Sequence, residues 1–302
     1  MRFIWGFVSP STLPNHEIGR GDTPLGTTRI TARLPQGYPK FHGKITASLG
    51  GGVRAINRGE NLMATQSVIE RLDVEVNDFV ERCLIFREDA WTPNRCRMWV
   101  YQHRLNTRQR NSVLKLKTAT NCPIWDIKLD IIHACTQEII ADDEFGGGEP
   151  HWKILEDLGV RIGMDRDAIQ SATPTPTQQM CWDAWSGLMT NCHWLLGLIA
   201  NTCAERHNVP GYGTGLTREM GWNAMVALKW MEIWNISRED VSFFNLHTEA
   251  DLEHSELGWR TIADYAEELN LVDDVVDSCR RNLVVWETYF NGICFAGDAM
   301  DS

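Results

Sequence analysis

The sequence predicts an all-α fold, with a bundle of seven or eight helices over residues 61–302. Apolar side chains recur at helical spacing from about residue 62 onward, as Val68, Leu72, Val76 and Phe79 do in the first predicted helix. After residue 60, no segment shows the alternating pattern that is typical of strands. A hydrophobic content of 43% with 23% charged residues is typical of a globular protein.

Residues 1–60 form a different segment, rich in Gly, Pro and Thr and without a helical period. Thr27–Leu34 alternates as a short strand or an extended arm would. Ser48–Gly52 resembles a phosphate-binding loop but lacks the Lys-Ser/Thr that follows such loops, so we interpret it as a flexible turn. We therefore expect an irregular N-terminal arm of residues 1–60, which precedes the bundle.

Proline and glycine mark the boundaries of the early helices. Thr92-Pro93 and Pro123 open the second and third predicted helices, and Gly146–Gly148 interrupt the third before Pro150 restarts it. The later helices are predicted over about 181–206, 217–234, a segment leading from Ser237 to His247, 258–269 and 272–290.

Charge and cysteine usage restrict the classes of function. The net charge is −11, but residues 1–118 hold 18 Lys and Arg against 10 Asp and Glu, and the rest hold 11 against 30. The basic residues are dispersed and no nucleic-acid motif accompanies them, so we expect no nucleic-acid partner. We expect no membrane association and a cytoplasmic location, because no apolar run is long enough to span a membrane and no signal-peptide pattern is present. Nine singly spaced cysteines indicate reduced thiols.

One helical segment carries a metal-ligand pattern. His247, Asp251 and His254 stand at positions i, i+4 and i+7. On an α-helix Asp251 lies about 40° and His254 about −20° around the axis from His247, so the three side chains share one stripe. Imidazole and carboxylate on one stripe suit iron, manganese or zinc. The triplet alone leaves a solvated polar helix face open as an alternative.

Two earlier segments offer further ligands of the same kind, namely Glu144 with His151, and Glu205 at the end of a long apolar helix. Helical bundles that activate oxygen hold two irons among such carboxylates and histidines. Three carboxylates carry a formal charge of −3, which leaves one positive charge on a pair of Fe²⁺ ions. The remaining imidazoles can complete each metal's coordination.

With these motifs the sequence resembles the haem-oxygenase-like diiron oxidases and oxygenases, relatives of thiaminase II and pyrroloquinoline quinone synthase. That family's metal set is a Glu followed by a His, a single Glu on a later helix, and a closing His-x₃-Asp-x₂-His. The resemblance covers roughly residues 90–290 and implies six ligands: Glu144, His151, Glu205, His247, Asp251 and His254. Three glycines separate Glu144 from His151, so Glu138 or Asp143 could take the place of Glu144.

The resemblance also implies a function: an enzyme with two Fe(II) ions and O₂ as co-substrate, acting on a small amino acid or carboxylate metabolite. An external electron donor would be needed, and a homodimer is expected only by analogy. The family's N-oxygenating members add a carboxylate from an earlier helix, but residues 94–117 contain no Asp or Glu. This favours C–H oxidation, meaning desaturation, hydroxylation or C–C cleavage.

Two other classes of function remain open. One is a metal-free thiaminase-like or cofactor-synthesis enzyme on the same bundle, which would need a cysteine nucleophile or cofactor-binding basic residues in its pocket. The other is a non-catalytic interaction protein whose acidic helices bind a basic partner.

Overall fold

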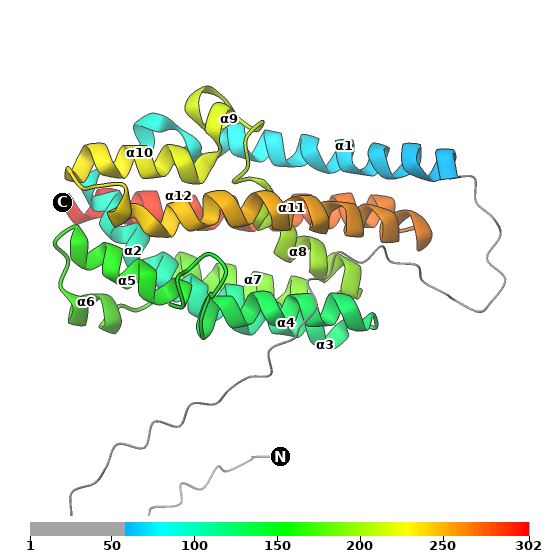
Figure 1. Ribbon diagram of the computed structural model, residues 1–302, viewed down its shortest axis with the longest axis horizontal. Helices are drawn as coiled ribbons and strands as arrows, with labels where there is room; N and C mark the ends of the chain where they lie inside the picture. Colours follow the sequence, from blue (N-terminus) through cyan, green and yellow to red (C-terminus); the bar gives the residue numbers. More distant parts are fainter. Residues whose placement is uncertain (1–57, 302) are drawn as a thin grey trace, which may run out of the picture. The chain divides into compact units, whose positions relative to one another are not determined.

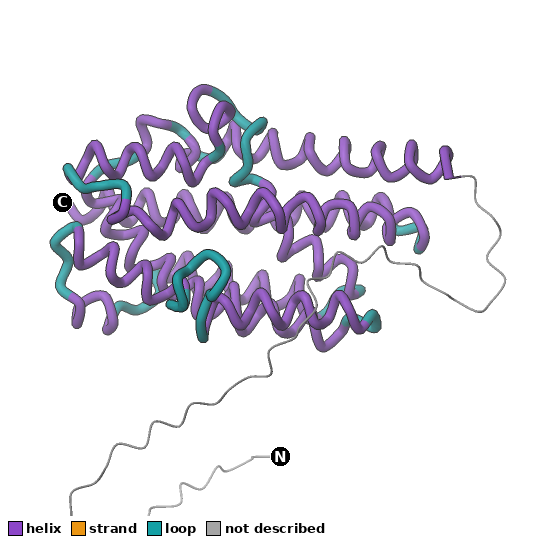
Figure 2. Tube along the Cα trace, viewed as in Figure 1, coloured by secondary structure: helices purple, strands orange, loops and turns teal. Residues whose placement is uncertain are grey.

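The computed structural model describes the backbone of residues 58–301 and the side chains of residues 65–300, apart from those at positions 204, 253 and 257. The all-α prediction is confirmed, because the described residues form helices and contain no strand beyond one isolated bridge, between Asp142 and Glu149 (Figure 2). The predicted arm of residues 1–60 lies outside the described residues except for the first turn of the first helix.

Twelve α-helices make up the described part of the chain, more than the seven or eight expected because breaks divide several of them. Their bounds are α1 (Arg58–Arg82), α2 (Pro93–Arg108), α3 (Lys115–Asn121), α4 (Trp125–Ile139), α5 (His151–Arg161), α6 (Arg166–Ser171), α7 (Pro176–Thr190), α8 (Trp194–Arg206), α9 (Gly215–Met220), α10 (Trp222–Trp234), α11 (Ser242–Glu268) and α12 (Val272–Asp298) (Figure 1).

The two longest helices organise the bundle. Helix α12 packs against α1, α2, α7 and α8, and it buries Val275, Leu283, Trp286 and Phe290 on its inner side. Helix α11 packs against α8, α10, α1 and α5, and Figure 1 shows it with α1 and α10 above it and α5 below. None of the described helices combines the length and the apolar character that crossing a membrane requires.

Four of the predicted helices are divided or joined in the structure. The single helix expected over 181–206 is two, because α7 ends at Thr190 and the His193 ring accepts a hydrogen bond from the backbone of Leu195 to open α8. The helix expected over 217–234 breaks at Gly221, whose φ of 86° favours glycine. In contrast, the separate helices expected before and after Gly258 are one continuous α11.

The connection from α2 to α3 is a π-helical segment, Gln109–Leu114. Helix α2 begins as predicted, with Thr92 accepting a hydrogen bond from the backbone of Arg95 and Pro93 in the first turn. The wider turn of the π segment buries the basic residues Arg110 and Lys115 inside the bundle. Such segments frequently occur at functional sites.

Candidate metal centre

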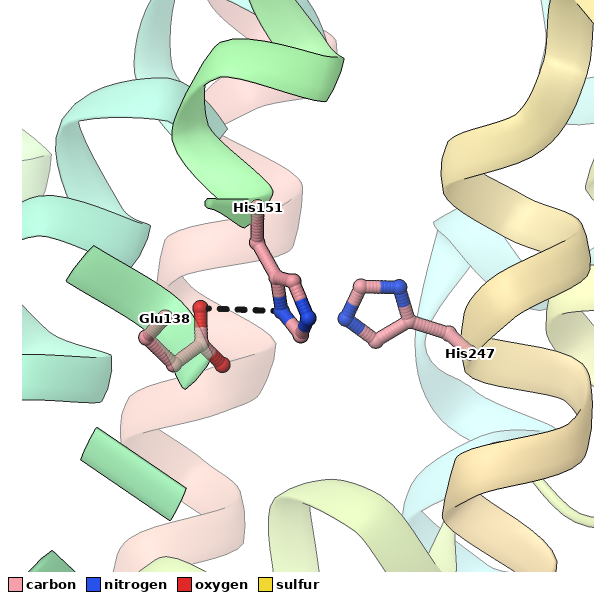
Figure 3. Close-up of side chains that lie close together, drawn as sticks. All are labelled: Glu138, His151 and His247. Carbon is pink, nitrogen blue, oxygen red and sulfur yellow. Dashed lines mark ion pairs between the residues drawn. The ribbon is translucent and has the colours of Figure 1, made fainter. Parts of the chain in front are cut away.

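Three side chains from separate helices converge inside the bundle. Glu138 comes from the last turn of α4, His151 from the first turn of α5 and His247 from α11, and one ligand atom of each lies within 4.8 Å of the others (Figure 3). The rings of His151 and His247 face one another with their centroids 4.8 Å apart. This is the one such group of three among the residues that the structure describes.

The loop between α4 and α5 delivers His151 to this cluster. Asp142 bridges back to Glu149, with the Gly148 backbone donating to the Asp142 carbonyl at 2.8 Å. Gly147 and Gly148 adopt φ values of 63° and 87°, which favour glycine. A Cβ at Gly146 would lie 2.7 Å from that of Asp142. The three glycines therefore close the loop tightly.

Closure of the loop places Asp142 against His151. One oxygen of the Asp142 carboxylate lies 2.8 Å from His151 Nε2, and the other accepts from the backbone N–H groups of Glu144 and Phe145 at 3.0 and 2.9 Å. Burial raises the pKa of Asp142, but the hydrogen bond and charge of His151 and the backbone amides of Phe145 and Gly146 outweigh it and hold the pKa well below its usual range. Asp142 thus fixes the orientation of the His151 ring.

Glu138 faces the other nitrogen of the same ring, with 3.3 Å between Glu138 Oε2 and His151 Nδ1. Burial alone would lower the pKa of His151, but the negative charges of Glu138 and Asp142 raise it to about 9. Burial likewise would raise the pKa of Glu138, which the charge of His151 instead lowers to about 2. Without a metal, His151 is therefore an imidazolium between two carboxylates.

His247 is held as a neutral ring. Its Nδ1 donates to the Phe243 carbonyl at 2.8 Å, one turn earlier in α11, which leaves Nε2 available to a ligand. Burial, and then the charge of His151, lower the pKa of His247 to about 4.

Asp251 and Glu205 lie in the same cavity with different partners. One Asp251 oxygen accepts from the side-chain amides of Asn208 and Asn223 at 2.7 and 2.9 Å. Burial and the charge of Glu205 raise the pKa of Asp251 well above its usual value. Glu205 pairs with Lys115 at 3.1 Å; burial raises the pKa of Glu205, but Lys115 outweighs it and the pKa is lowered.

The structure brings five of the six predicted ligands to one cavity of about 70 Å³. They are His151, Glu205, His247, Asp251 and His254. His254 is half-buried, with its ring 6.1 Å from that of Phe145. The cavity continues inward between aromatic rings, including Trp99, Trp222 and Phe290.

Glu144 is the predicted ligand that the structure does not bring to the cluster. Its side chain is 58% exposed, accepts from Gln137 at 3.2 Å and lies 3.9 Å from the exposed ring of His133. The Asp142–Glu149 bridge turns the chain outward at this point. Glu138, the first alternative left open by the sequence, occupies the place beside His151, whereas Asp143 is exposed.

A sequence signal for Glu138 existed. Ile131, Cys135 and Glu138 stand at i, i+4 and i+7 in α4 and all are buried, so this acidic residue falls on an apolar face. An acidic residue on such a face is expected to have a partner. Asp142, Lys115 and Arg110 carried no comparable signal, because the loop closure and the π segment that bury them are tertiary features.

Basic groups offset the carboxylates of the cavity. The Arg110 guanidinium donates to the Ala200 carbonyl at 2.6 Å and lies 4.6 Å from the Trp286 ring. Burial lowers the pKa of Arg110 to about 10. Burial also lowers the pKa of Lys115, but the charge of Glu205 outweighs it and the pKa is raised. Both groups therefore remain cations at neutral pH.

Comparison with known families matches residues 97–287 to the model of a family described as iron-containing redox enzymes. The match covers more than half of the chain. The chain belongs to this family. The chain also resembles a solved structure from Shewanella denitrificans OS217, described as a domain of unknown function with a heme oxygenase-like fold. The TM-score is 0.56 and the identity 13%, over 82% of this chain and 97% of that one.

These findings confirm the haem-oxygenase-like fold and family expected from the sequence. A search of curated proteins finds no match.

The cluster of Glu138, His151 and His247 fits a metal ion. Glu138 Oε2 and His151 Nδ1 are buried and lie 3.3 Å apart as an ion pair, but neither atom has a partner with hydrogen-bond geometry. Buried polar atoms without a well-aligned hydrogen bond are rare and call for an explanation. Each histidine has its other nitrogen held by an oxygen, Asp142 for His151 and Phe243 for His247, which is the outer arrangement typical of metal-ligating histidines. Imidazole with carboxylate suits iron.

Proposed function

We propose that this protein is an O₂-dependent non-haem diiron oxidase or oxygenase. The observation that carries the proposal is the convergence of buried Glu138 and His151 with half-buried His247, in one cavity with Glu205 and Asp251. Glu138, His151 and His247 would hold one iron. Glu205, Asp251 and His254 line the same cavity and are available for a second, so Glu138 takes the role first assigned to Glu144.

Two iron ions bound there would supply the redox chemistry, with O₂ as the oxidant. The protein's own groups prepare the cavity for them. Asp142 and the Phe243 carbonyl hold the two histidine rings in fixed orientations, and Asn208 and Asn223 do the same for the Asp251 carboxylate. The surrounding aromatic side chains exclude bulk water.

The substrate that we propose is a small amino acid or carboxylate metabolite, oxidised at a C–H bond, with an external electron donor. The segment from α2 to α3 supports the C–H assignment, since it presents Arg110 and Lys115 to the cavity rather than an additional carboxylate. The metal-free alternative would need a cysteine nucleophile or cofactor-binding basic residues in the pocket. No cysteine is found among the described residues that line the cavity, and its basic residues, Arg110 and Lys115, already pair with the Ala200 carbonyl and Glu205.

Anoxic titration with Fe(II) tests the proposal directly. We expect the purified protein to take up about two irons per chain and, once loaded, to consume O₂ when a substrate is present. Binding of one iron or none at saturating Fe(II), in protein whose helical content is intact, would rule out the diiron assignment.

A further inference from the structure

A second and larger cavity adjoins the metal centre. It has a volume of about 280 Å³ and lies between α3, α4, α8 and α11. Lys115, Ala134, Gln137, Glu205 and His254 line both this cavity and the metal cavity. The two cavities therefore meet on the side of the centre that Glu205 and His254 form.

The volumes separate the roles of the two cavities. One water molecule occupies roughly 10–15 Å³ of a cavity's volume. The metal cavity of about 70 Å³ therefore has room for roughly six water-sized groups. Metal ions and their small ligands would fill it. The adjoining cavity, at about 280 Å³, is four times larger and can accept an organic molecule.

The chemistry of the larger cavity is apolar on its walls and polar at the metal end. Ile131 of α4 and Leu198 of α8 form opposite walls, and both side chains are buried. At the metal end stands the Lys115 ammonium, which has three donors, of which Glu205 accepts one. Ligand pockets combine an apolar lining with a few placed polar groups in this way.

Helices α8 and α11 pack closely where they line this cavity. A Cβ at Gly258 of α11 would lie 2.5 Å from Thr202 Cγ2 of α8, so the two helices approach closely at this position. Both residues line the cavity. The contact between α8 and α11 therefore forms one wall of the cavity.

We propose that this cavity is the substrate chamber. The substrate is an organic molecule with an apolar body between Ile131 and Leu198 and one hydrogen-bond-accepting end, such as a hydroxyl, carbonyl or carboxylate group, that faces Lys115. Lys115 and the length of the chamber set specificity. This inference rests on the proposed function, because it places the oxidised carbon beside Glu205 and His254.

The test uses 1-hexanol and hexylammonium as probes on anoxic, Fe(II)-loaded protein, with binding measured by saturation-transfer NMR. We expect hexanol to bind at least tenfold more tightly than hexylammonium, since Lys115 repels the cation. Leu198→Trp should fill the chamber and weaken hexanol binding at least tenfold, with the iron content unchanged. Leu129→Trp is the matched control, because Leu129 lies on the exposed side of α4 and should leave hexanol binding unchanged.

A second variant guards against misfolding of the first. Leu198→Ala enlarges the chamber, so the preferred chain length in a series of primary alcohols should increase relative to that of the wild type. Equal hexanol binding in wild type and Leu198→Trp, or an unchanged chain-length preference in Leu198→Ala, would overturn the chamber assignment. Failure to bind iron would instead overturn the proposed function, so the two failures are distinguishable.

Discussion

Glu138→Gln removes one negative charge from the buried cluster while keeping the size of the side chain. The pKa of His151 is raised to about 9 from the 6.5 of an ordinary histidine, which corresponds to roughly 3 kcal/mol in favour of the imidazolium. Glu138 and Asp142 supply this against the effect of burial. An opposite charge at this range shifts a pKa by about 1–3 units, so we expect the pKa of His151 to fall by that amount in the variant.

The stability of the metal-free protein should follow the same pKa. Because the folded pKa of His151 exceeds its unfolded value, the stabilisation from this ion pair is complete below about pH 6.5 and is lost as the pH rises through about 9. In Glu138→Gln the stabilisation is smaller, and its loss ends at a lower pH. Urea unfolding at pH 6, 7.5 and 9, together with NMR titration of the His151 ring, measures both effects. Identical pH profiles for wild type and variant would refute the reasoning.

Iron binding gives the same substitution a second readout with a matched control. Glu138→Gln should weaken Fe(II) binding at least tenfold, since a carboxylate is a better ligand than an amide, whereas Glu144→Gln should leave it unchanged because Glu144 is exposed. Both variants replace a carboxylate by an amide. The opposite pattern, with iron lost only in Glu144→Gln, would restore the ligand first predicted from the sequence.

Three further substitutions test other parts of the structure. Asp142→Asn should weaken iron binding by about 10–100-fold at unchanged fold, measured by Fe(II) titration, because it loosens the His151 ring; unchanged affinity would contradict this. The pKa of buried His207 is lowered to about 3, so between pH 6.5 and 3 it binds a proton only in the unfolded chain, which destabilises the fold as the pH falls. In His207→Phe this loss, up to about 1.4 kcal/mol per pH unit in urea unfolding, should be absent. Arg104→Met should destabilise the fold by up to about 3–5 kcal/mol, because buried Glu156 loses its one buried cation and keeps only Gln170 and the exposed Arg166. The double variant with Glu156→Leu should recover stability in the same assay.

Much of the fold could be predicted from local patterns. Thr92 and Pro93 open α2 as expected, and the apolar period of the remaining segments predicted an all-α bundle. Exact helix bounds depended on tertiary contacts. Gly221 ends α9 with a backbone conformation that no apolar period reveals. In contrast, Gly258 does not end a helix, because its small size lets α11 pack against Thr202 of α8.

The candidate site shows the same division. The stripe of His247, Asp251 and His254 could be predicted because the three residues belong to one helix, whose geometry fixes their relation. The partner of His151 could not, since it depends on how the loop between α4 and α5 closes. Spacing along the chain pointed to Glu144, but the bridge from Asp142 to Glu149 turns that residue to solvent and leaves Glu138 beside the ring.

The charges of the cavity explain how the protein holds this site together without a metal. Imidazolium His151 is held between Glu138 and Asp142, and Lys115 offsets Glu205. Asp251, with its raised pKa, is the carboxyl that burial and Glu205 drive towards the neutral form. Iron would therefore take the place of protons on His151 and Asp251, so its binding releases protons and strengthens as the pH rises. Glu138 and Glu205, whose ion pairs stabilise the metal-free fold, are held by those same ion pairs in the positions from which they would bind the metal.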